Sequence, residues 1–240
     1  MVASGRFSPN QVDQWNIQER IRKLPAELRP HFQRVFNPVP TPPKKKSTPP
    51  STIMYDWVHV FVVVGVAQFE FTNFLHSAKK KMGLTWSMIR NFVMLWQWPR
   101  WRNNRGNPAS VWCPKRESSC HDTFKSGASE MLDIHKVFKA FVLRVIDPIA
   151  ERCGLQAEVA SMLAMCASLK LLCQIHIGRA PPNAVHLLRC ACSHHLGLYK
   201  IADSAQAVKP KHHYMMHLSA QLQEHGHLWN TFVLERNHKM

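Results

Sequence analysis

Hydrophobic residues recur at helical spacing through most of the second half of the chain. Between residues 129 and 152 the apolar positions close to helical spacing include Leu132, Val137, Phe138, Phe141, Val142 and Val145. Similar patterns cover residues 155–177, 181–207 and 211–225, and the last of these ends at Gly226, a residue typical of the position just past a helix. Apolar side chains at this spacing line one face of an α-helix. The chain is therefore predicted to be mainly α, with a buried helix face made of Met162, Met165, Leu169 and Leu172.

The part of the chain before these helices has a mixed pattern. Residues 51–55 have the composition of a strand that ends at Asp56. Residues 58–77 are ambiguous, because their valines favour a strand whereas their length without turn signals favours a buried helix. A helix is predicted at 85–96, with Thr85 as its N-cap.

Composition divides the chain into three parts. Residues 1–37 form a short basic segment with two helical patterns separated by Pro25. Residues 38–50 contain six prolines and Lys44–Lys46, which predicts an extended, solvated linker. The three lysines are either a nuclear-import signal or only solvated charge. Residues 51–240 are then one domain of ordinary size.

The charge of the chain favours a polyanionic partner. Its 31 Lys and Arg residues against 15 Asp and Glu residues give a formal net charge of +16 at pH 7. Nucleic acid is the first expected partner and an anionic membrane the second, with a ribosomal-type or merely solvated basic surface as the alternative. Residues 1–10 lack the apolar core of a secretory signal, and the longest apolar run, 57–67, is shorter than the roughly 20 residues that span a bilayer. Seven cysteines, an odd number, predict reduced thiols in an intracellular compartment.

An irregular segment at 97–127 joins cationic and aromatic side chains. The residues that we assign to DNA contact there are Trp98, Arg100, Trp101, Arg102 and Arg105, and Trp112 follows them. Cations bind phosphates and aromatic faces stack on bases, so the combination suits nucleic acid. The alternative is a loop whose tryptophans cap the helical core.

Zinc is not expected from the cysteine spacing. The ligand types occur in two runs, one with Cys113, Cys120 and His121 and the other with Cys190, Cys192, His194 and His195, but neither has the paired Cys-x2-Cys spacing of a zinc site. His213 and His217 lie four apart on one predicted helix face and form half a metal site at most.

Three motifs carry a resemblance when taken together. They are Asp56-x-x-His59, the run Lys209-Pro210-Lys211-His212-His213 that leads to His217-Leu218, and Phe232-Val233-Leu234-Glu235-Arg236. Singly, an Asp at a helix start is usually an N-cap and a Glu near a chain end is usually solvated. Their order and spacing, with Glu235 following Asp56 by 179 residues, resemble the second half of a CACTA-type DDE transposase.

The resemblance implies an RNase H-like α/β fold, present here as a partial remnant with few strands, and a helical insertion bundle at about 78–210. It also implies that Asp56 and Glu235 are two of three catalytic carboxylates that hold two Mg²⁺ or Mn²⁺ ions, so their carboxylates should lie within about 8 Å. His59 would orient this site or contact DNA, with a packed helical histidine as the alternative. Lys209 and Lys211 are assigned to DNA contact.

The sequence departs from the family pattern at the first catalytic aspartate. The acids before Asp56 are Asp13, Glu19 and Glu27, all in charged helical surroundings. We therefore expect a nuclear, transposase-derived DNA-binding protein without autonomous cleavage, with DNA or another transposase chain as its partner and no membrane. The alternatives are a non-enzymatic helical scaffold that binds proteins, and a gene fragment that does not fold alone.

Overall fold

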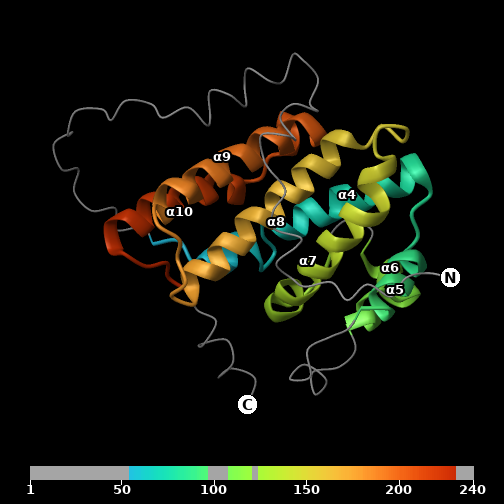
Figure 1. Ribbon diagram of the computed structural model, residues 1–240, viewed down its shortest axis with the longest axis horizontal. Helices are drawn as coiled ribbons and strands as arrows, with labels where there is room; N and C mark the ends of the chain where they lie inside the picture. The colour runs from blue at the N-terminus through green and yellow to red at the C-terminus, as the bar shows by residue number, and fades with distance from the viewer. Residues whose placement is uncertain (1–53, 97–107, 121–123, 231–240) are drawn as a thin grey trace. The chain divides into compact units, whose positions relative to one another are not determined.

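The computed structural model describes residues 54–96, 108–120 and 124–230, and within them the regular structure is helical, with no strand (Figure 1). The α-helices are α3 (Trp57–Phe61), α4 (Val66–Met82), α5 (Trp86–Met94), α6 (Pro114–Ser119), α7 (Ala128–Phe141), α8 (Gln156–His176), α9 (Ala184–Asp203) and α10 (Pro210–His225). Short 3-10 or π turns lie at Pro108–Val111, Val142–Ile146, Asp147–Ile149 and Ala205–Ala207.

The prediction of a mainly α chain is confirmed. The strand expected at 51–55 is not seen where it can be checked, because Met54 and Tyr55 have no regular structure and 51–53 lie outside the described residues. The segment 1–37 and the linker 38–50 also lie outside them.

Two predicted helix boundaries are confirmed. Thr85 caps α5, since its side chain accepts a hydrogen bond from the Met88 amide at 3.4 Å. Gly226 ends α10 in the left-handed conformation, with φ 72°.

The ambiguous segment at 58–77 is helical, in two pieces. α3 and α4 are separated by a turn that ends at Gly65, the N-cap position of α4. A Cβ at Gly65 would lie 2.5 Å from the Phe61 carbonyl carbon, so only glycine lets the chain turn this closely. Val58, Val60 and Val66 therefore pack in a helical core despite their strand propensity.

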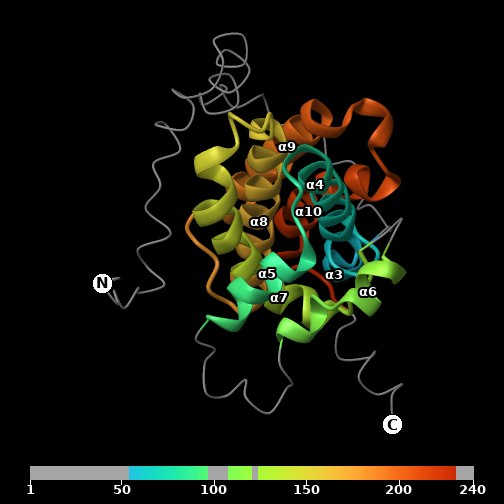
Figure 2. The same cartoon turned by 90° about the vertical axis from the view of Figure 1, so that its right-hand side faces the viewer.

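The centre of the fold is α8. It packs against α9 on one side and against α4 and α7 on the other, and α10 lies along α9 and α3 (Figures 1 and 2). The predicted inward face of α8 is confirmed, because its four residues are fully buried: Met162, Met165, Leu169 and Leu172.

An aromatic cluster fills the space between α4, α5 and α7. Phe138 lies at its centre, with ring centroids 4.6 Å from Phe71 and 5.4 Å from Trp112, the latter pair nearly parallel. Trp112 is 1% exposed, so this tryptophan of the basic-aromatic segment packs inside the fold rather than facing a ligand.

Two helical stretches are long and apolar enough to cross a membrane by length and composition. They are Trp57–Met82, with a mean hydropathy of 1.5, and Gln156–His176, with 1.4. The first stretch is longer than the apolar run at 57–67, which from the sequence alone is too short to span a bilayer. Most of each stretch is buried within the fold, as in the core helices of globular proteins, so length and composition carry no membrane argument here.

Candidate functional site

The Asp56 carboxylate lies at the start of α3. Its Oδ1 accepts hydrogen bonds from the amides of Val58, at 2.8 Å, and His59, at 3.3 Å. Its Oδ2 lies 2.9 Å from Nδ1 of His59. Asp56 is thus an N-cap whose negative charge is stabilised by the helix dipole, and His59 lies on its side of the helix as the spacing of three predicted.

Lys211 joins this site from α10. Its ammonium donates to the carbonyl oxygens of His59, at 2.7 Å, and Val63, at 2.8 Å, which are acceptors at the end of α3. Burial lowers the pKa of Lys211, and the nearby Asp56 carboxylate acts in the opposite direction. The ammonium that the sequence assigned to DNA is directed into the fold, whereas Lys209 is exposed one residue before α10.

Two further contacts bring distant segments to the same place. Gln221 of α10 pairs with the backbone of Tyr55 in both directions, accepting from its amide at 2.7 Å and donating to its carbonyl at 3.0 Å. The Trp57 amide donates to the Trp229 carbonyl at 3.2 Å. Trp229 precedes Glu235 by six residues. The segments that carry the three motifs, or lead to them, therefore meet at α3.

The turn after α3 is strained. Val64 has φ 46°, in the left-handed region that a β-branched residue rarely adopts, and its side chain is exposed. It directly follows Val63, whose carbonyl accepts from Lys211. Such strain costs about 1–3 kcal/mol and persists only where the surroundings enforce it. Here the enforcing contacts are the Lys211 bond and the close approach at Gly65.

Several residues that the sequence assigned to the site lie outside the described part of the chain. They are Glu235 and the five residues of the basic-aromatic segment, Trp98, Arg100, Trp101, Arg102 and Arg105. The expected approach of Asp56 to Glu235 thus stays a prediction.

Sequence reasoning missed a buried polar cluster formed by side chains of α4, α9 and α10. Glu70 of α4 and His195 of α9 are almost completely buried, and their Oε2 and Nε2 atoms lie 2.9 Å apart. His212 of α10 is also buried and lies against Tyr199, with ring centroids 4.3 Å apart. Asn73 donates to the Tyr199 hydroxyl at 2.8 Å. No local pattern pairs residues 125 positions apart, so only the fold reveals this cluster.

Both histidines of the cluster have a buried ring nitrogen without a described partner, and His212 also has a lowered pKa. Burial, followed by the charge of His195, lowers the pKa of His212 to about 4, so its ring is neutral at pH 7. Its Nδ1 accepts from the Lys209 amide at 3.0 Å, which leaves the proton on Nε2. Among the described residues, neither His212 Nε2 nor His195 Nδ1 has a hydrogen-bond partner. The cluster joins α4, α9 and α10 through desolvated groups.

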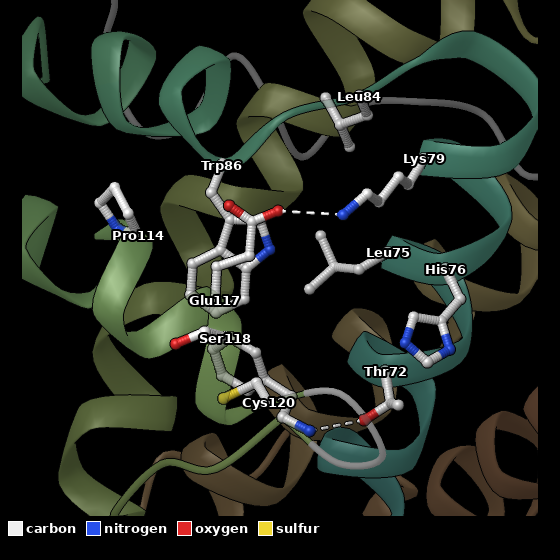
Figure 3. Close-up of a pocket in the computed structure, with 11 residues that line it drawn as sticks. Thr72, Leu75, His76, Lys79, Leu84, Trp86, Pro114, Glu117, Ser118 and Cys120 are labelled. Atoms are coloured by element: carbon white, nitrogen blue, oxygen red, sulfur yellow. Dashed lines mark hydrogen bonds and ion pairs between the residues drawn. The ribbon is translucent and has the colours of Figure 1, made fainter.

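A pocket lies between α4, α5 and α6 (Figure 3). It has a volume of about 220 Å³, and its apolar lining includes Leu75, Leu84, Trp86 and Phe124. Lys79 and Glu117 form an ion pair of 3.3 Å beside it, drawn as a dashed line in Figure 3. The Thr72 hydroxyl is already bonded to the Gln68 carbonyl and the Phe124 amide. The pocket therefore combines apolar surface with the polar side chains of His76, Ser118 and Cys120.

The described residues lack one kind of ligand cluster. Within the ranges that the structure describes, no group of three or more His, Cys, Asp or Glu side chains is placed to hold a metal ion, and Glu235 and His121 lie outside these ranges. The seven cysteines are free thiols, and burial raises the pKa of Cys166 and Cys192 to about 12, so these two are packing residues.

No family model, no curated protein and no solved structure matches this chain.

Proposed function

We propose that this chain is a DNA-binding protein derived from a CACTA-type transposase, and that it does not cleave DNA on its own. The observation that carries the proposal is that two motif segments, and the chain that leads to the third, meet at α3. Lys211, from the second motif, bonds to the carbonyl of His59, from the first, and Trp57 bonds to Trp229, six residues before Glu235. Motifs that form one ancestral site should converge in space, and an accidental resemblance gives no reason for it.

In this proposal the corner at Asp56, meaning Asp56, His59 and the Lys211 side chain that bonds to α3, is the remnant of a two-metal centre. Asp56 and Glu235 would hold Mg²⁺ or Mn²⁺, hard cations that prefer carboxylate oxygens, and His59 would keep the Asp56 carboxylate oriented. In-line displacement at phosphorus needs both the attacking and the leaving oxygen to be stabilised, which takes two metal ions. Two carboxylates are too few ligands to hold both ions. The partial RNase H-like fold and the nuclear location belong to the same proposal.

DNA binding should depend on the cations of the basic-aromatic segment. We expect the purified chain to bind duplex DNA with little sequence preference and with an affinity that falls steeply with salt, because binding releases counterions from phosphates. Changing Arg100, Arg102 and Arg105 together to Gln should reduce affinity. The slope of log K against log salt is negative, and the change should make it less negative by up to about 3. Fluorescence anisotropy at several salt concentrations measures both quantities.

The matched control removes the same charge from other surfaces. Lys136, Arg152 and Lys200 are exposed, and their triple change to Gln lowers the net charge equally. An equal loss of affinity in both triple variants would show that only total charge matters. Binding that ignores salt in the unaltered chain would overturn the nucleic-acid proposal.

Cleavage is tested with Mg²⁺ and Mn²⁺ on the same DNA. The expected result is no nicking by the unaltered chain. Metal-dependent nicking that disappears in both Asp56→Asn and Glu235→Gln would contradict inactivity, and would require a third carboxylate from elsewhere, such as a second transposase chain.

A helical scaffold is the second candidate, and exposed apolar side chains favour it. Met94 and Leu95 at the end of α5 are 60% and 84% exposed. Docking through such a face strengthens or stays constant with salt, whereas DNA binding weakens. The salt titration therefore distinguishes the two candidates directly.

A further inference from the structure

A pair of histidines on α10 faces solvent away from the buried cluster. His213 and His217 are both exposed and lie one helical turn apart. Their Nε2 atoms point toward each other at 3.1 Å, and the ring centroids are 4.7 Å apart with an interplanar angle of 81°. Nothing in the corner at Asp56 uses these nitrogens.

We propose that His213 and His217 form a bidentate site for a transition-metal ion such as Zn²⁺. A zinc ion lies about 2.0–2.1 Å from each imidazole nitrogen, so two nitrogens on one ion are about 2.8–3.4 Å apart for N–Zn–N angles between about 90° and the tetrahedral value. The observed 3.1 Å falls in this range. The two rings can therefore take up an ion with little rearrangement.

Neighbouring aromatic rings hold one of the ligands in place. The His217 ring stacks on Tyr55, with centroids 5.4 Å apart and an interplanar angle of 14°. Tyr55 also stacks on Tyr214 at 5.1 Å, and Gln221 fixes the Tyr55 backbone from both sides. Ordering a ligand in advance lowers the entropy cost of binding. This support distinguishes the pair from two unrestrained surface histidines.

The donor set selects the ion. Imidazole favours Zn²⁺, Cu²⁺ and Ni²⁺, whereas Mg²⁺ and Ca²⁺ prefer oxygen ligands. The site is thus chemically separate from the carboxylate remnant at Asp56, and it stands whether or not the chain binds DNA. Two protein ligands leave positions on the ion for water or for a donor from a binding partner.

The simplest competing explanation is a hydrogen bond between two neutral rings, one donating and one accepting. Both arrangements weaken when the imidazoles are protonated, so pH alone does not separate them. A metal titration does, because only a ligand pair loses ion binding when either ring is removed.

The test is a titration of the full chain with Zn²⁺ at pH 7.5, followed by calorimetry. His213→Gln and His217→Gln should each weaken the strongest binding step about tenfold or more, as losses of metal-supporting residues do. Unaltered binding in both variants would overturn the proposal. Circular dichroism without metal checks that the variants fold, and their exposed positions on α10 make that the expected result.

The matched control is a histidine–cysteine pair on α9. His186 Nε2 lies 3.5 Å from Cys190 Sγ, also four residues apart on one helix. Co²⁺ distinguishes the two sites, because a thiolate ligand adds an intense charge-transfer band that an imidazole site lacks. We expect Cys190→Ser to leave the strongest Zn²⁺ step unchanged. If Cys190→Ser abolishes that step, or if Co²⁺ at one equivalent shows the thiolate band, the metal site is at Cys190 and the proposal fails.

Discussion

Acid should destabilise this fold through buried histidines, and His135 gives the clearest case. Its side chain on α7 is 2% exposed. Burial, followed by the charge of Lys136, lowers the pKa of His135 to about 4. His212 and His194 shift in the same direction, also to about 4 and mainly through burial. Asp203 opposes them, because burial raises the pKa of its carboxyl to about 6 and favours the protonated form in the fold.

The sign and size follow from proton linkage. The pKa of His135 is 6.5 in the unfolded chain and about 4 in the fold, so the unfolded state binds more protons between these values. The stabilisation by the neutral ring is complete above about pH 6.5 and is lost as the pH falls toward 4. One pKa unit corresponds to about 1.4 kcal/mol, so His135 alone should cost about 2 kcal/mol between pH 7 and pH 5. This is a large share of a typical stability of about 5–15 kcal/mol.

The measurement is urea unfolding at pH 7, 6 and 5, followed by circular dichroism. His135→Gln cannot titrate, so its free energy of unfolding should fall by about 2 kcal/mol less than that of the unaltered chain over this pH range. His76→Gln is the matched control, because the His76 side chain is already exposed to water. Equal pH dependence in the unaltered chain and His135→Gln would refute the reasoning, whatever their stabilities at pH 7.

Substitutions at three further places test other parts of the fold by the same unfolding measurement. Gly65→Ala should cost about 2 kcal/mol because its Cβ would meet backbone at 2.5 Å, whereas Gly127→Ala, with nothing within 4 Å, should be nearly neutral; equal effects would contradict this. Glu70→Leu or His195→Leu alone should each cost about 3–5 kcal/mol by leaving a buried partner, and the double variant should recover at least half, whereas additive losses would rule out coupling. Lys211→Met should cost about 2 kcal/mol by removing two charged hydrogen bonds to α3, and an unchanged midpoint would show that water replaces them.

Helical content could be predicted because it depends on the spacing of apolar and capping residues that are close in sequence. The apolar face of α8, the Thr85 cap and the Gly226 end each depend on residues within a few positions of one another. The segment at 58–77 was not decided, because strand propensity is weak and burial in a helical core overrides it. α6 was missed because a helix of six residues that starts with proline has no periodicity to detect.

The candidate site could be predicted only in part. The spacing of Asp56 and His59 placed both side chains on one helix face, as found. The inward direction of Lys211 depends on how α10 crosses α3, and the partnership of Glu70 with His195 depends on how α4 meets α9. Both are consequences of tertiary packing between segments more than 100 residues apart. Charge and motif identity carry no information on such directions.

Asp56 and Lys211 both make contacts that stabilise the fold independently of any catalytic role. Asp56 caps α3, Lys211 ties α3 to α10, and both contacts stabilise the fold in the absence of metal. In the proposed function, any metal chemistry would depend in addition on Glu235 and on a third carboxylate. The cap role and the proposed metal role of Asp56 can be separated, because asparagine caps a helix about as well as aspartate but lacks the negative charge that binds a divalent cation. Asp56→Asn would therefore remove the proposed metal ligand while keeping the start of α3, whereas Asp56→Ala would remove both and confuse a loss of metal binding with a loss of structure.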